Sequence, residues 1–93
     1  QYDAATVLGT VQDATGSTVP GVKISLKNTL TGVLITTNTD AEGNYSFLNQ
    51  RIGSYTVSAE KAGFKVANSA VFTLTVNARQ RVNLSLEVGD VSQ

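Results

Sequence analysis

Apolar and polar residues alternate along most of the chain, the pattern of β-strands with one face in a core and one in water. In residues 22–27 every second residue is Val, Ile or Leu, and the others are Lys or Ser. Residues 81–88 repeat the pattern, with an inward row of Val82, Leu84, Leu86 and Val88. No window of useful length has apolar residues at helical spacing, so the sequence predicts essentially no helix.

Further strands are expected at residues 6–12 and 33–39. Three more runs each place aromatic or aliphatic residues on one face, and these inward rows are Tyr45 and Phe47; Tyr55, Val57 and Ala59; Phe72, Leu74 and Val76. About seven short strands at this spacing predict an all-β sandwich of two sheets.

Gly, Pro, Asp and Asn residues separate the strands and mark the predicted turns. The turn residues on which the fold is expected to depend are Asp13, Gly16, Pro20, Gly21, Asp40, Gly43, Gly53 and Gly63. Residues 28–32 are expected to form a hairpin, and residues 40–44 and 49–53 two more turns of the same kind. Glycine supplies positive φ in such turns, and an Asp side chain caps nearby backbone amides.

The amino-acid composition excludes several classes of function. The 93 residues suit one domain, and seven basic residues balance seven acidic ones, which argues against a strongly basic nucleic-acid binder. Histidine and cysteine are absent, so thiolate metal sites and the usual catalytic bases are excluded. No apolar run approaches the roughly 20 residues of a transmembrane helix. Gln1 at the start and the absence of Met indicate a processed or excised piece.

The spaced glycines and aromatic residues resemble those of a known family. The residues that carry the resemblance are Gly9 to Asp13, Gly16, Pro20 to Val22, Thr39, Asp40, Gly43, Tyr45 to Phe47, Gly53, Tyr55, Val57, Gly63 and Phe64. Together they resemble a carboxypeptidase-regulatory-like domain. The resemblance implies a transthyretin-like (prealbumin-like) Greek-key β-sandwich over residues 5–88, with tails at 1–4 and 89–93. It also implies a non-catalytic companion module, with no enzyme activity and no cofactor.

Within this family the chain is similar to the N-terminal domain of many TonB-dependent outer-membrane receptors. The similarity lies in the Gln start, the turn at residues 28–32 and the ending at residues 86–91. It implies an extracytoplasmic accessory module on the periplasmic face of the outer membrane, with the rest of a receptor as its protein partner.

The chain departs from the family pattern in one loop. Gln50 and Arg51 stand where a Leu-Pro pair usually precedes the Gly-Tyr turn. The loop therefore loses an apolar plug and gains a charge. Two interpretations stay open: a solvated loop variant, since loops vary freely, or a partner-contact rim formed by Gln50, Arg51 and Phe64.

Asp40, Glu42 and Asn44 are spaced like calcium ligands. An EF-type loop needs Gly at its sixth position and a bidentate Glu at its twelfth. Counting from Asp40, those positions hold Tyr45 and Arg51, so both requirements fail. We expect Asp40 to accept backbone N–H bonds in a turn, and we expect no metal.

Related adhesin domains carry an intramolecular isopeptide bond between Lys and Asn or Asp beside a buried acid. Here Val11 stands at the lysine position, and alternation turns both Asn83 and Glu60 outward. Lys23, Lys27, Lys61 and Lys65 likewise fall at outward or loop positions, so a catalytic lysine with a depressed pKa is not expected.

Two binding roles remain as alternatives. A carbohydrate module would need exposed aromatic rings, and the core pattern leaves Tyr2 and Phe64 for that task, although Phe64 also suits the end of the sandwich. A cell-surface or filament subunit would assemble with like subunits by strand addition, through edge strands and tails. Basic residues form no stripe with aromatics, so no nucleic-acid partner is expected.

Overall fold

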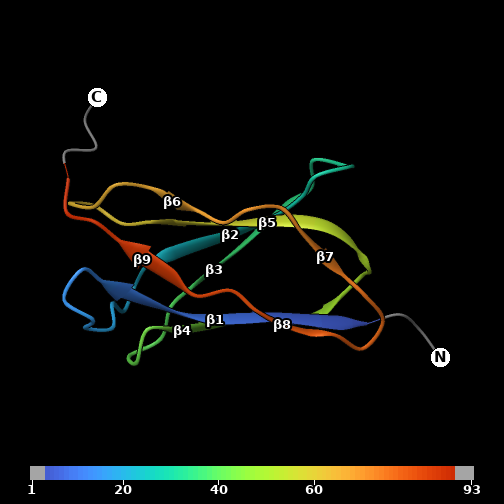
Figure 1. The fold of residues 1–93 in the computed structure, drawn as a ribbon, viewed down its shortest axis with the longest axis horizontal. Helices are drawn as coiled ribbons and strands as arrows, with labels where there is room; N and C mark the ends of the chain where they lie inside the picture. The colour runs from blue at the N-terminus through green and yellow to red at the C-terminus, as the bar shows by residue number, and fades with distance from the viewer. Residues whose placement is uncertain (1–3, 90–93) are drawn as a thin grey trace.

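The computed structural model describes residues 4–89, which form a two-layered β-sandwich without helix (Figure 1). The strands are β1 (Ala5–Asp13), β2 (Lys23–Asn28), β3 (Leu34–Asn38), β4 (Asn44–Gln50), β5 (Gly53–Glu60), β6 (Ala67–Asn68), β7 (Phe72–Leu74), β8 (Arg79–Arg81) and β9 (Leu84–Leu86). Because the described part lacks helix, it offers no helical segment that could span a bilayer. Tails were predicted at residues 1–4 and 89–93, and of these residues 1–3 and 90–93 lie outside the described residues.

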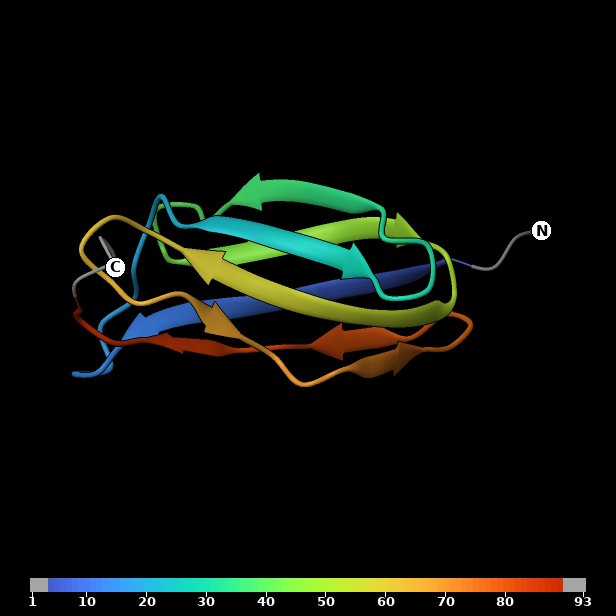
Figure 2. The same cartoon turned by 90° about the horizontal axis from the view of Figure 1, so that it is seen from above.

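The strands form two sheets that face each other (Figures 1 and 2). One sheet has the order β4-β1-β8, and β9 also pairs with β1. The other has the order β3-β2-β5-β6, and β7 also pairs with β5. β8 and β9 both run parallel to β1, while the other pairings are antiparallel. The prediction of an all-β, transthyretin-like sandwich is confirmed.

The core lies between the sheets and follows the alternation predicted from the sequence. In β1, Val7 and Val11 are fully buried, and in β5 Val57 and Ala59 are fully buried. Tyr45 and Phe47 of β4 contact each other edge to face, with ring centroids 5.9 Å apart. Aromatic pairs favour this arrangement because the positive edge of one ring meets the negative face of the other.

Two of the predicted turns do not join neighbouring strands of one sheet. The turns at residues 40–44 and 49–53 connect β3 to β4 and β4 to β5, and each connection crosses from one sheet to the other. The expectation of further hairpins there was therefore wrong, whereas the hairpin at residues 28–32 is confirmed by β2–β3 pairing. Glycine and Asp or Asn residues occur in all three turns, so these residues do not distinguish a hairpin from a crossing between sheets. β4 lies in the other sheet because it pairs with β1, which is distant in the sequence.

Val76 and Val88 were expected to face inward, and both predictions were wrong: the side chains are 50% and 77% exposed. β7 ends at Leu74, and Val76 lies in a turn in which Ala78 N–H donates to Thr75 C=O. Val88 lies past the end of β1, whose last residue pairs with Leu86, so nothing covers it. Between residues 4 and 89 there are nine strands, against about seven predicted, because the last segments divide into short strands.

Candidate interaction surface

Asp13 organises the connection that follows β1. Its Oδ1 accepts hydrogen bonds from the Thr15 hydroxyl at 2.6 Å, the Thr15 amide at 2.9 Å and the Ser17 amide at 3.1 Å. These donors, the Thr15 hydroxyl first, lower the pKa of the Asp13 carboxyl from its usual value. Gly16 follows at a φ of 89°. Together they hold a polar turn at one end of the sandwich.

Asp40 organises the connection from β3 to β4 by the same means. Its Oδ1 accepts the backbone amides of Glu42 and Asn44, each at 2.9 Å. The Asn44 Oδ1 is itself an acceptor for the Thr10 hydroxyl at 2.6 Å. Between residues 4 and 89 the structure places no three acidic, His or Cys residues together as metal ligands. The arrangement is that of a hydrogen-bonded turn.

Gly43 of this turn is buried, and its φ is 80°. A Cβ at this position would lie 2.8 Å from the Thr18 Cβ and 3.0 Å from the Val11 carbonyl oxygen. Glycine is therefore required here both for its backbone conformation and for the close approach of the β1–β2 connection.

Thr39 was quoted with the family pattern, but no role was predicted for it. It is the buried polar residue of the described chain, at 6% exposure. Its hydroxyl donates to the Val19 carbonyl at 2.8 Å and accepts the Val22 amide at 2.9 Å. It thus clasps the segment around Pro20 and Gly21, where Gly21 has a φ of 70°. A Thr directly before a turn Asp was the only sequence signal.

The residues considered for an isopeptide bond are not brought together. Val11 is buried on β1 and pairs with Leu84, whereas Glu60 is exposed at the end of β5 in the other sheet. Asn83 is exposed, and its Oδ1 accepts the Thr10 amide at 2.9 Å. Asn83 therefore fastens the β8–β9 connection to β1.

Gln50 is the last residue of β4 and Arg51 follows it in the β4–β5 turn, at the end of the molecule where β1 begins. The Gln50 side-chain amide donates to the Leu48 carbonyl at 2.8 Å, and the Tyr55 hydroxyl donates to the Arg51 carbonyl at 2.9 Å. The loop is thus tied to the sandwich through its backbone, and the guanidinium of Arg51 is left at the surface.

A groove of about 380 Å³ lies between this turn and the β2–β3 hairpin. We call it the hairpin groove, and its lining residues are Leu26, Asn28, Thr31, Val33, Ile35, Asn49, Gln50, Arg51 and Tyr55. Next to it, Leu30 at the hairpin is 84% exposed and Ile52 is 44% exposed. Val33 and Ile35 of the lining are 60% and 37% exposed, so this end of the sandwich presents several exposed apolar side chains.

Phe64 lies at the opposite end of the sandwich. It is half-buried, packs against the core and bridges to Val88, while Gln50 pairs with the first residue of β1. The predicted rim of Gln50, Arg51 and Phe64 is therefore not one contiguous surface. The sugar-stacking candidate Tyr2 lies outside the described residues, and the ring of Phe64 is engaged with the core.

A second hollow, of about 520 Å³, is more polar. It lies beside β1, β3 and β4, and its lining includes Thr10, Asn38, Asp40, Asn44 and Arg81. Its aromatic residue, Tyr45, is only 5% exposed. The hollow therefore offers hydrogen-bonding groups but no free aromatic face for a sugar ring.

The chain matches the model of the carboxypeptidase regulatory-like domain over residues 6–87, almost its whole length. The chain belongs to this family.

Two curated relatives match part of the chain. Serine-aspartate repeat-containing protein C of Staphylococcus aureus is 46% identical over 55 residues, which are 58% of this chain and 6% of that protein. Serine-aspartate repeat-containing protein F of Staphylococcus epidermidis is 42% identical over 50 residues, 54% of this chain and 3% of that protein. The match spans only a small fraction of these relatives.

Solved structures share the fold at low identity. The Bacillus anthracis TIE protein has a TM-score of 0.77 at 16% identity, over 92% of this chain and 17% of that one. A cohesin–X-dockerin complex from Acetivibrio cellulolyticus has a TM-score of 0.74 at 19% identity, over 96% of this chain and 61% of that one. A Klebsiella pneumoniae 5-hydroxyisourate hydrolase has a TM-score of 0.71 at 20% identity, over 91% of each chain. At such identities the likeness shows the fold alone.

Proposed function

We propose that this domain is a non-catalytic, extracytoplasmic accessory module of a larger protein and that it acts through protein contacts. The observation that carries the proposal is the hairpin groove, whose lining includes exposed Val33 and Ile35 and the charged Arg51. Membership of a regulatory-like family supports a companion role. The polar groups of the turns are engaged in holding the backbone, as Asp13 and Asp40 illustrate.

The parent protein that we propose is a TonB-dependent outer-membrane receptor with this module at its N-terminus. The resemblance of the hairpin turn at residues 28–32 and of residues 86–91 supports this choice. In that setting the hairpin groove would contact another part of the receptor, and the chain would continue beyond Gly89 into the next domain. The accessory module would itself transport nothing.

The first test is the size and location of the native polypeptide that carries this sequence. An antibody raised against the domain should detect, in denatured outer-membrane fractions, a chain far heavier than the 9.8 kDa of the domain. Recovery of an intact 9.8 kDa polypeptide from a surface polymer would refute the receptor and favour a filament subunit. A heavy chain found only in the cytoplasm would refute the extracytoplasmic role.

The second test addresses the contact surface within the parent protein. Ile52→Asp places a charge beside the hairpin groove and should release the module from the rest of the protein, measured as faster proteolytic removal of the domain. Val66→Asp is the matched control, because Val66 is similarly exposed, at 52%, near the Phe64 end. Equal proteolysis of both variants and the wild type would contradict a role for the groove.

The similarity to serine-aspartate repeat-containing proteins supports a second candidate function, that of a module in a repeat-containing surface protein. A glycan-binding module is a weaker candidate, because the described part of the chain shows no exposed aromatic platform in either hollow. Glycan-array binding that is lost in Thr10→Ala or Asn38→Ala would favour it over protein contacts.

A further inference from the structure

The edge strand β3 leaves half of its backbone groups without a neighbour. The Val33 carbonyl accepts the Asn28 amide of β2 at 2.9 Å, and the Thr39 amide donates to the Val22 carbonyl at 3.0 Å. In an antiparallel ladder, every second residue directs both its N–H and its C=O to the same neighbour. Residues 33, 35, 37 and 39 therefore bond to β2, while Leu34, Thr36 and Asn38 direct N–H and C=O outward.

This edge carries none of the features that usually protect a free strand. Natural edge strands are blunted by charges, proline, bulges or shortness. Residues 28–39 contain no charged residue and no proline, and the β2–β3 register runs over five pairs without a shift. Leu34 is 55% exposed and Ile35 is 37% exposed.

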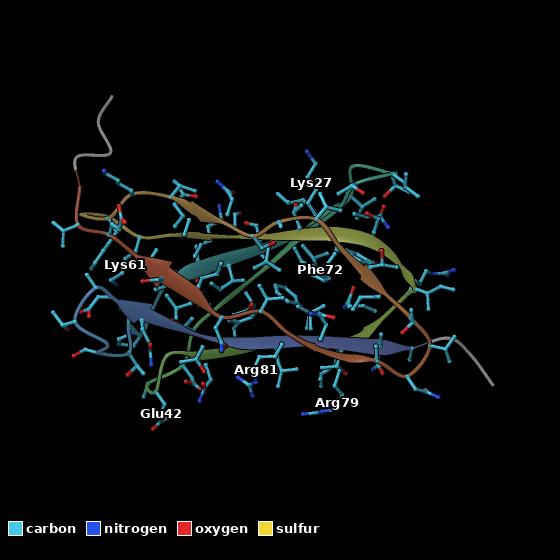
Figure 3. The ribbon with its side chains drawn as sticks, viewed as in Figure 1. Lys27, Glu42, Lys61, Phe72, Arg79 and Arg81 are labelled. Atoms are coloured by element: carbon cyan, nitrogen blue, oxygen red, sulfur yellow. The ribbon has the colours of Figure 1, made fainter. Side chains whose placement is uncertain are left out.

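Other edges of the described sandwich are protected. β8 is three residues long, and its Arg79 and Arg81 project away from the sheet (Figure 3). β6 and β7 have two and three residues. β4 is longer, but its pairing with β1 shifts register between Ala5 and Val7, and within β4 Asn49 has a left-handed backbone conformation. The contrast singles out β3 as an edge open to another strand.

We infer that β3 pairs antiparallel with β3 of a second copy of this chain, about a two-fold axis through Thr36. The outward residues 34, 36 and 38 are spaced symmetrically about that position. The axis sets Thr36 opposite Thr36, and Leu34 opposite Asn38 in both directions, with about six new backbone hydrogen bonds. The two sheets then become one continuous sheet across the axis, an isologous contact.

Charge favours a second copy as the occupant. The strand brings no charge of its own, so self-pairing sets no like charges opposite each other, and a Thr–Thr pair at the axis is favourable. Lys23 and Lys27 belong to β2, one strand behind the edge, and Lys27 projects from the outer face (Figure 3). Each copy keeps its lysines away from the axis. The inference goes beyond the accessory role and does not depend on it.

The test is the mass of the 93-residue chain at rising concentration, by sedimentation equilibrium. The wild type should pass from 9.8 kDa toward twice that mass between micromolar and millimolar concentration. Thr36→Lys sets two lysines opposite each other at the axis and should raise the dissociation constant about tenfold or more. Thr36→Glu should do the same. A wild type that stays at 9.8 kDa throughout would overturn the inference.

Mixing the two variants tests the register. An equal mixture of Thr36→Lys and Thr36→Glu should associate more tightly than either variant alone, because each lysine now faces a glutamate. Thr73→Lys and Thr73→Glu are the control pair, since Thr73 is exposed on β7, and they should dimerise like the wild type. A mixture that remains monomeric while both variants are folded by circular dichroism would refute pairing at Thr36.

Amide hydrogen exchange of the wild type gives a readout that needs no variant. On dimerisation the amides of Leu34, Thr36 and Asn38 should become protected, whereas those of Ile35 and Thr37 are protected at every concentration. Dimerisation without protection of the first three amides would place the contact on another surface and overturn the proposal.

Discussion

β2 and β3 are partners in one hairpin, yet they differ in how they are buried. In β2, Ile24 and Leu26 are at most 1% exposed, and the flanking Lys23 and Lys27 face water. In β3, none of the five residues is buried, including Leu34 and Ile35. The two strands are hydrogen-bonded over five residue pairs, so their backbones are held equally well on the shared side.

The difference comes from what lies across the sandwich and not from the residues themselves. β2 is flanked by β3 and β5, and its inward side chains belong to the central core cluster. β3 is the last strand of its sheet (Figure 2). Ile35 and Thr37, which pair with the buried Leu26 and Ile24, therefore remain partly exposed. An apolar residue on an edge strand can therefore remain available for a partner.

Truncating one isoleucine in each strand should give the largest effect. Ile24→Ala leaves a cavity in a closed core and should lower the free energy of unfolding by about 3–4 kcal/mol. Ile35→Ala removes a side chain already 37% exposed and should cost about 1 kcal/mol. Urea unfolding at low protein concentration measures both.

Equal losses in Ile24→Ala and Ile35→Ala would show that β3 is as deeply packed as β2. The difference in burial between β2 and β3 would then be refuted, and β3 would not be an open edge strand. Since a domain of this size has only about 5–10 kcal/mol of total stability, Ile24→Ala should remain folded but with a clearly lower midpoint.

The sequence predicted the strands whose two faces differ in polarity. The alternation in residues 22–27 and 55–59 marks the buried residues of β2 and β5 correctly, because each of these strands has one face in the core. It does not mark buried residues in β3, where residues 34–38 do not alternate, and it failed for Val88, which lies beyond the end of β9. A two-residue alternation shows which side chains share one face of a strand. It does not show whether another part of the protein covers that face.

Contacts between distant residues could not be predicted. Gly9 appeared only as part of the family pattern, but a Cβ there would overlap the Val82 carbonyl and come within 2.9 Å of the Tyr45 ring. The hairpin groove joins residues from β2, β3 and the β4–β5 turn, and the departure at Gln50 and Arg51 was its only trace in the sequence. Such sites depend on which sheet each strand joins, and local turn chemistry does not encode that choice.

Thr39 lies directly after β3. It is buried, whereas the residues of β3 itself are exposed or half-buried. Thr39→Val should cost about 2 kcal/mol, because it removes two hydrogen bonds and leaves the Val19 carbonyl and the Val22 amide poorly paired. Thr36→Val, on the exposed part of the same strand, should change the free energy of unfolding by less than about 0.5 kcal/mol. If the two substitutions proved equivalent in thermal unfolding, the Thr39 clasp would be dispensable.

A smaller effect than that of Thr39→Val is expected at neutral pH for Tyr45, on β4, the edge strand of the opposite sheet. Unlike the residues of β3, Tyr45 is buried, and its hydroxyl donates to the Val82 carbonyl. Tyr45→Phe should therefore cost about 1 kcal/mol at neutral pH. Burial also raises the pKa of Tyr45 to about 12, so the folded state favours the neutral phenol.

This shift makes the Tyr45→Phe comparison depend on pH in a definite direction. The unfolded chain loses the phenolic proton near its ordinary pKa of 10.0, before the folded chain does. The stabilisation is thus complete below that pH and is lost as the pH rises toward about 12. Urea unfolding at neutral pH and at about pH 11 should show the advantage of the wild type over Tyr45→Phe shrinking. A constant difference would mean that the phenol is as open to water as the side chains of β3.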